Sequence, residues 1–368
     1  MSVIILGDVH IGRSVSIGRI GLGSALNSRI ADQAYLLDWT LEQAIDVGAS
    51  NIIVTGDIFE EPKPHPALIT LFIAWLKKCE INSIHVHIVL GNHDILRTGN
   101  YYTSPLDIIS YCELDNVSIY RSIDTVIIDC VAFTFLPFRD RKSFFCDTHN
   151  AALEVLQQYL VYELSAIPMI YKKVLVGHLA IEGSIPVGDE IDDMSNELLC
   201  PVKMFEGYDY VWMGHIHKPQ VMSKSPYVAH IGSMDISNFG ETDHKKHIIV
   251  FDANEKEKFY QIDIPTRPLN KIVISVPKDT KDTTKYVINE ITKNNLELNK
   301  AIVKLEVHLI SPELLPINRT TVEKFLYSMG VHNVCGISES KKLAPIKKTV
   351  TNVIDTTMDI TSAIKKYA

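Results

Sequence analysis

The sequence predicts an α/β protein in which two packed mixed sheets are flanked by helices, followed by a smaller α+β unit. Over the first 265 residues, β-branched apolar runs alternate with stretches of helical spacing, which is typical of βαβ units. Past Pro265 the pattern changes to short strands and helices. A chain of 368 residues is also long for one domain. We therefore expect a first domain over 1–265, a smaller capping domain over 266–345 and a C-terminal tail over 346–368.

Two helices are predicted in the first domain. Asn27 or Ser28 can cap a helix that runs to about Val47, where Gly48 ends it. The second helix is expected from about Pro66 to Cys79. Strands are expected at Val3–Leu6, Ile52–Thr55, Ile84–Leu90, Thr125–Phe135, Val174–Val176, Tyr210–Met213 and His247–Asp252.

The smaller unit is predicted as a compact α+β cap. Its strands are expected at Lys271–Val276, Ala301–Leu309 and Val331–Cys335, with helices near Tyr286–Lys293 and Thr320–Met329. In the tail, apolar residues between Val350 and Ala368 could form a short amphipathic helix. Such a helix could dock on a partner, fold back on the cap, or remain disordered.

Five clusters of glycine with Asp, Asn or His each follow a strand-like run. They are Gly7-Asp8-Val9-His10, Gly56-Asp57, Gly91-Asn92-His93-Asp94, Gly177-His178 and Gly214-His215-Ile216-His217. Paired divalent ions need carboxylate oxygens and neutral imidazoles, with one carboxylate shared between them. Residues two apart on an extended chain face the same way, so Asp8 with His10, and His215 with His217, can each serve one site.

Each cluster alone has an ordinary interpretation. An Asp-x-His pair arises by chance, and a histidine at a strand end is more often a hydrogen-bonded core or loop residue than a ligand. The fivefold repetition after successive strands favours a two-metal site, because the carboxyl ends of strands in open α/β sheets converge on one edge.

The order of these clusters resembles that of the calcineurin-like metallophosphoesterases. Gly-Asn-His-Asp in the third cluster fits the nuclease and phosphodiesterase branches, since protein serine/threonine phosphatases usually carry Glu in place of Asp94. The chain most resembles SbcD-type nuclease subunits. The stretches that carry this closer resemblance are Gly56–Glu60, Tyr208–Gln220 and Gly232–Glu241.

The resemblance implies a role for each cluster residue. One ion would be held by Asp8, His10, Asp57 and His217, and the other by Asp57, Asn92, His178 and His215, with Asp57 as the bridge. His93 would face the phosphate, with Asp94 orienting its ring, although Asp94 could instead cap a turn. Oxygen and imidazole ligands without thiolates suit Mn²⁺, while zinc or iron could occupy the same ligands.

The resemblance further implies a DNA nuclease, acting as an exonuclease on duplex DNA and as an endonuclease on single strands. Its partners would be DNA and an SbcC-type coiled-coil ATPase in an SbcCD-like complex. A homodimer is expected from the resemblance and from apolar positions near residues 66–80 and 97–112. Two alternatives stay open: a phosphodiesterase or phosphatase on small substrates, and a non-catalytic assembly component of a DNA-repair complex.

Composition sets broad limits. With 46% hydrophobic and 22% charged residues, no apolar run of membrane-spanning length and a start that enters a strand at once, the chain is expected to be cytoplasmic with no membrane partner. Six scattered cysteines without a C-x-x-C pair argue against a zinc ribbon or disulfide framework. Because the net charge is −8, binding of DNA would require a local basic patch or a partner protein. Candidate patches, each also interpretable as solvated surface, are Arg139-Arg141-Lys142, Lys172-Lys173 and Lys245-Lys246.

Overall fold

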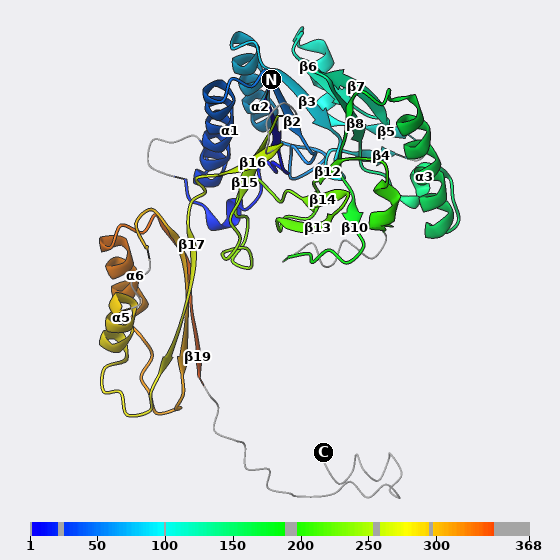
Figure 1. Ribbon diagram of the computed structural model, residues 1–368. Coiled ribbons are helices and arrows are strands. Elements are labelled where there is room, and N and C mark those ends of the chain that lie inside the picture. The colour runs from blue at the N-terminus through cyan, green and yellow to red at the C-terminus, as the bar shows by residue number, and fades with distance from the viewer. Residues whose placement is uncertain are drawn as a thin grey trace, which may run out of the picture.

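The computed structural model describes residues 2–20, 26–98, 101–187, 197–252, 258–293 and 297–341. Within them, two six-stranded mixed sheets pack face to face, with helices on both outer faces, and a smaller unit lies beside this sandwich (Figure 1). The predicted two-sheet α/β architecture is confirmed. The predicted tail helix lies outside the described residues.

The first sheet has the order β16-β15-β1-β2-β3-β6. Its strands are β1 (Val3–Leu6), β2 (Asn51–Val54), β3 (His85–Val89), β6 (Val117–Tyr120), β15 (His247–Phe251) and β16 (Phe259–Asp263). β1, β2, β3 and β6 run parallel, so their carboxyl ends meet at one edge. β15 and β16 extend the sheet antiparallel on the other side of β1.

The second sheet has the order β13-β14-β12-β9-β8-β7. Its strands are β7 (Asp124–Ile128), β8 (Val131–Leu136), β9 (Lys172–Gly177), β12 (Tyr210–Met213), β13 (Gln220–Lys224) and β14 (Tyr227–His230). The predicted strand at Thr125–Phe135 is a hairpin, because Asp129 and Cys130 adopt positive φ and turn the chain back.

Alternation along the strands divides the core into layers. Val3 and Ile5 of β1 pack between the sheets with Phe133, Val176 and Trp212, while Ile4 and Leu6 face the helices. On that side lie α1 (Ser28–Asp46) and α2 (Pro66–Ile81). The opposite face is covered by α3 (His149–Ala166), a helix that was not predicted from the sequence (Figure 1).

Short elements complete the sandwich around the strand ends. They are the hairpin of β4 (Leu96–Thr98) and β5 (Tyr101–Thr103), the pair β10 (Ala180–Ile181) and β11 (Leu199–Cys200), and the 3-10 helices η1 (Val15–Ile17), η2 (Pro105–Tyr111), η3 (Arg141–Phe144) and η5 (Val202–Phe205). No helix in the described ranges is long and apolar enough to cross a membrane.

Residues 269–341, which we call the C-terminal unit, form a separate sheet with its own apolar core. It consists of β17 (Leu269–Val276), α5 (Thr283–Lys293), β18 (Ile302–Leu309), α6 (Arg319–Ser328) and β19 (Asn333–Lys341). All three strands are parallel, with a helix in each crossover. This corrects the α+β expectation: a strict alternation of strand and helix produces parallel neighbours, which makes the unit α/β.

Candidate metal centre

Five strands deliver the predicted site residues to one edge of the sandwich. Three of these strands, β1, β2 and β3, lie in the first sheet, and β9 and β12 lie in the second. Their carboxyl ends supply Asp8, His10, Asp57, Asn92, His93, Asp94, His178, His215 and His217. Eight of these side chains lie together in one cluster, whereas the Asp94 carboxylate contacts the backbone of Ile58 and Gly91.

The first group of contacts joins Asp8, His10 and His217. The Nε2 atoms of His10 and His217 are 2.9 Å apart, and His217 Nε2 is 3.9 Å from Asp8 Oδ2. His10 Nε2 is also 3.5 Å from Asp57 Oδ2. Asp8 is fully buried, so its carboxylate needs a cationic or hydrogen-bonding partner.

The second group joins Asn92, His178 and His215. The expectation that His215 and His217 serve one site is therefore wrong, because His215 has a φ of 80° and the chain is not extended there. His178 Nε2 lies 2.9 Å from Asn92 Oδ1, and His215 Nδ1 lies 3.1 Å from the same oxygen. His178 Nε2 is 3.3 Å from Asp57 Oδ2. The same Asp57 oxygen thus lies beside both groups, which is the place that a bridging ligand would occupy.

In three of the imidazoles, one ring nitrogen is held by a partner outside the cluster, so the other nitrogen faces the centre. His178 Nδ1 donates to the Thr55 carbonyl at 2.8 Å, which leaves Nε2 with a lone pair. His215 is held at Nε2 by the Glu197 carboxylate at 2.5 Å, so its Nδ1 faces inward. Glu60 Oε2 lies 2.9 Å from His10 Nδ1. Such outer partners fix the tautomer of a metal-binding histidine, and the donor set therefore fits two divalent ions.

Charge at the centre favours ionised Asp57. Burial alone would raise its pKa, but His178, His93 and His10 outweigh burial and hold the pKa well below its usual range. An ionised carboxylate between two groups of imidazoles is the ligand that a pair of divalent cations requires. Asp57 therefore has the charge, as well as the place, of a bridge.

The comparison with known families decides the identity of this centre. The sequence model of the calcineurin-like phosphoesterases matches residues 1–219, which is more than half of the chain. The chain belongs to the calcineurin-like phosphoesterase family. It is accordingly a metal-dependent phosphoesterase, and the clustered Asp and His residues are its candidate ligands.

Curated relatives are about one quarter identical to this phosphoesterase over the aligned residues. The SbcD subunit of the nuclease SbcCD from Staphylococcus epidermidis is 25% identical over 74% of this chain and 74% of its own length. The protein of the same name from Staphylococcus saprophyticus is 26% identical over 74% and 71%. That of Escherichia coli K12 is 25% identical over 66% and 65%.

The phosphoesterase centre is built on unusual backbone. His10, Asp57 and His215 have φ of 49°, 48° and 80°, in the left-handed region of backbone conformation that residues other than glycine rarely adopt. Close packing adds to this: a Cβ on Gly91 would collide with Asp57 Oδ1, and one on Gly214 would collide with Asp8 Oδ1. These two glycines are needed because the carboxylates lie directly against their backbone.

Asp94 has a different partner from the one expected. Its carboxylate oxygens accept from the backbone N–H groups of Ile58 and Gly91, at 2.9 and 3.0 Å, and the expected contact with the His93 ring is replaced. The His93 ring is held instead by the Glu60 carbonyl, 2.6 Å from Nδ1. Burial, reinforced by the charge of Asp57, raises the pKa of Asp94 to about 7. Asp94 therefore joins the loop that carries Asp57 to the loop that carries Asn92 and His93.

Sequence reasoning missed the groups behind the ligands, which are Glu60, Glu197, Glu241 and Lys246. The Lys245-Lys246 pair is a candidate basic patch for DNA or solvated surface in the sequence, and both interpretations are wrong for Lys246. It is 2% exposed and donates to the His217 carbonyl, Ser233 Oγ and Glu241 Oε2 at 2.9, 2.7 and 2.7 Å. Glu241 Oε1 lies 3.8 Å from His217 Nδ1. This buried ion pair supports His217 from both its carbonyl and its ring. The sequence signal for these four groups is limited to Glu60 and Glu241, which lie in the SbcD-like stretches Gly56–Glu60 and Gly232–Glu241.

Proposed function

We propose that this phosphoesterase is a two-metal-dependent DNA nuclease, an exonuclease on duplex DNA and an endonuclease on single strands. It would act as the catalytic subunit of an SbcCD-like complex for DNA end processing and recombination. The observation that carries the proposal is the single Asp57 oxygen lying beside both imidazole groups, in a chain whose relatives are named as SbcCD nuclease subunits.

Each ligand has a proposed place. Asp8, His10, Asp57 and His217 would hold one ion, and Asp57, Asn92, His178 and His215 the other. The ions, which we propose to be Mn²⁺, supply the activated nucleophile and neutralise charge on the phosphate. The protein's contribution is to fix the ligands from behind, through Glu60, Thr55, Glu197 and Glu241.

His93 is the proposed catalytic residue that faces the phosphate. Its backbone N–H donates to Asp57 Oδ1 at 2.9 Å, and its Nδ1 is occupied by the Glu60 carbonyl, which leaves Nε2 for the substrate. The charge of Asp57 and the contacts with Glu60 raise the pKa of His93 above its usual value in spite of burial. A protonated imidazole can stabilise the transition state or protonate the leaving oxygen. Asp94 would keep the His93 loop in place.

The other proposed features concern assembly. We propose domain limits of 1–265, 266–345 and 346–368, with the second domain engaging DNA and the third binding an SbcC-type ATPase. A homodimer and a cytoplasmic location complete the proposal. The name of the relatives, which describes one component of a complex, supports the idea of a partner.

The proposal is tested by release of nucleotides from end-labelled linear duplex DNA with Mn²⁺. The His93→Asn variant should lose about 10²- to 10⁴-fold in rate while its bound manganese, measured by elemental analysis, is unchanged. A chelator should abolish cleavage by the wild type. His85→Asn, in β3 and outside the candidate site, is the matched control and should cleave like the wild type.

Two results would count against the proposal. A wild-type rate in His93→Asn would remove the assigned role of His93. A fully metallated wild type that hydrolyses a chromogenic diester but no DNA, even with an SbcC-type ATPase added, would indicate an esterase for small substrates.

A further inference from the structure

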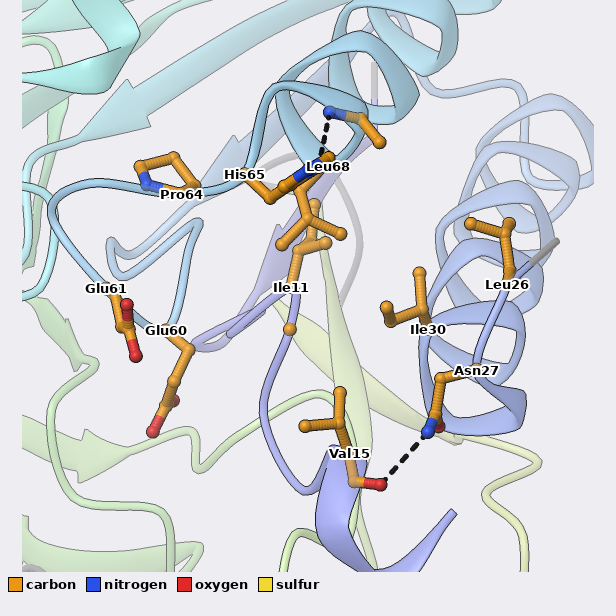
Figure 2. A pocket seen from close by; sticks show the side chains of 12 residues that line it. Ile11, Val15, Leu26, Asn27, Ile30, Glu60, Glu61, Pro64, His65 and Leu68 are labelled. Carbon is orange, nitrogen blue, oxygen red and sulfur yellow. Dashed lines mark hydrogen bonds between the residues drawn. The ribbon is translucent and has the colours of Figure 1, made fainter. Parts of the chain in front are cut away.

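A pocket of about 420 Å³ lies between the first turns of α1 and α2 and the chain that follows β1 (Figure 2). Its walls are largely apolar, with Ile11, Val15, Ile30 and Leu68 directed toward the common space. The volume falls within the range of sites for small organic groups, which are typically apolar with a few convergent polar groups.

The pocket adjoins the metal centre. Ile11 follows the ligand His10 directly in the chain. Glu60 lines the pocket, and its carboxylate and carbonyl also contact His10 and His93, at 2.9 and 2.6 Å. A phosphate held on the metals and facing His93 would therefore bring the group bonded to it to the mouth of this pocket.

The polar groups of the pocket select the kind of occupant. Two glutamates, Glu60 and Glu61, line one end of it, and none of the described lining residues is a lysine or an arginine. Glu60 Oε2 is turned to His10 Nδ1 and Arg13 Nη1, at 2.9 and 3.5 Å, so the exposed Glu61 carboxylate is the acceptor left for an occupant. A phosphodiester would be repelled here. A flat apolar ring that carries N–H donors fits both the walls and this end of the pocket. Nucleobases with an exocyclic amino group have this chemistry, because carboxylates accept hydrogen bonds from such groups, as from N4 of cytosine.

We propose that this pocket receives the base of the nucleotide next to the scissile phosphate and favours cytosine, adenine and guanine over thymine, which has no exocyclic amino group. This inference rests on the proposed nuclease function. It assigns the apolar walls to the faces of the base and the exposed carboxylate of Glu61 to its amino group, while Glu60 stays with His10 and Arg13. The phosphate stays outside, on the metal centre.

The test compares cleavage of oligo-dC and oligo-dT of equal length, with methyl p-nitrophenyl phosphate as a diester that carries no base. The wild type should show a kcat/KM about tenfold higher on oligo-dC. Leu68→Trp, which fills the pocket, should raise KM on oligo-dC and so lower kcat/KM on oligo-dC about tenfold, while kcat/KM on the small diester stays unchanged. The variant should also lose the preference for oligo-dC over oligo-dT. Ile170→Trp, at an exposed position of the sandwich outside the pocket lining, is the matched control.

Glu61→Gln is the second variant, because Glu61 is exposed and its replacement leaves the apolar walls intact. It should narrow the preference for oligo-dC, so it also decides the matter if Leu68→Trp does not fold. Equal wild-type rates on the two oligonucleotides, or a preference that both variants retain, would overturn the pocket assignment and leave the nuclease standing. Cleavage of the small diester without cleavage of either oligonucleotide would instead overturn the proposed function.

Discussion

The sandwich and the C-terminal unit bury very different side chains. Within residues 269–341, Thr283 is the only described polar side chain that is buried, and the core is otherwise apolar. The sandwich buries carboxylates, imidazoles, an arginine and a lysine, including Asp8, Asp57, Arg29 and Lys246. Buried charges destabilise a fold unless each one is paired. The contrast indicates that the sandwich gives up stability to hold a charged site, while the C-terminal unit does not.

Backbone strain follows the same division. Three candidate ligands, His10, Asp57 and His215, lie in the left-handed region. In the described part of the C-terminal unit, Lys300 is the only residue other than glycine with positive φ. Strained residues persist where the surroundings fix them, and they concentrate at functional sites. If the charged interior of the sandwich serves the metal centre, changes to it should lower metal affinity as well as stability.

The largest effect is expected from Lys246→Met. The change leaves Glu241 as a buried carboxylate without its ammonium partner, which should destabilise the metal-free protein by about 3–5 kcal/mol. Because Glu241 and Lys246 both support His217, Mn²⁺ affinity should fall about 10- to 100-fold. Urea unfolding and titration calorimetry measure the two effects.

Two further variants separate support of the metal from simple packing. Lys245→Met, next in the chain but 86% exposed at its side chain, should change stability by less than about 0.5 kcal/mol. Adding Glu241→Gln to Lys246→Met should restore part of the stability, because it removes the unpaired charge, but not the affinity for Mn²⁺. Wild-type affinity in Lys246→Met would show that the pair supports the fold alone.

An intermediate effect is expected where the two regions join. Arg267 donates from Nε and Nη2 to the Asp32 carboxylate, at 2.8 and 2.5 Å, and from Nη1 to the Lys300 carbonyl at 2.9 Å. Arg267→Ala should destabilise the protein by about 2–3 kcal/mol and separate thermal unfolding into two transitions. Scanning calorimetry with limited proteolysis checks this. Lys271→Ala, which removes an exposed pair with Glu306 inside the C-terminal unit, should cost less than about 1 kcal/mol and keep the transitions as they are in the wild type.

The candidate ligands could be predicted from the sequence, whereas the groups that support them could not. Ligands are recognisable because metal chemistry restricts residue types, and glycine next to Asp8 or Asp57 restricts them further. Glu60, Glu197 and Glu241 resemble surface glutamates until the fold places them against imidazoles. Lys246 likewise follows an exposed lysine in the chain. The strand direction in the C-terminal unit was within reach, since alternation of strand and helix favours parallel pairing.

The smallest effect concerns His87, a buried histidine between the sheets and away from the metal ligands. Its Nδ1 lies 2.8 Å from the Tyr120 hydroxyl and its Nε2 lies 3.0 Å from Asn51 Oδ1. Burial, with a contribution from His85, lowers the pKa of His87 to about 3. The unfolded chain, with an ordinary histidine pKa near 6.5, therefore binds a proton that the folded protein excludes.

The sign of the pH effect follows from this difference. Stability from neutral His87 is fully present above about pH 6.5 and falls as the pH drops toward 3, by about 2 kcal/mol between pH 7 and pH 5. Urea unfolding in the presence of a chelator should show this loss of stability between pH 7 and pH 5 in the wild type. The His87→Gln variant should lose about 2 kcal/mol less over the same interval, whatever its stability at pH 7. An identical pH dependence in both proteins would mean that His87 takes up its proton without unfolding. A difference of the expected size would locate part of the acid sensitivity in the core between the sheets, in contrast to the apolar core of the C-terminal unit.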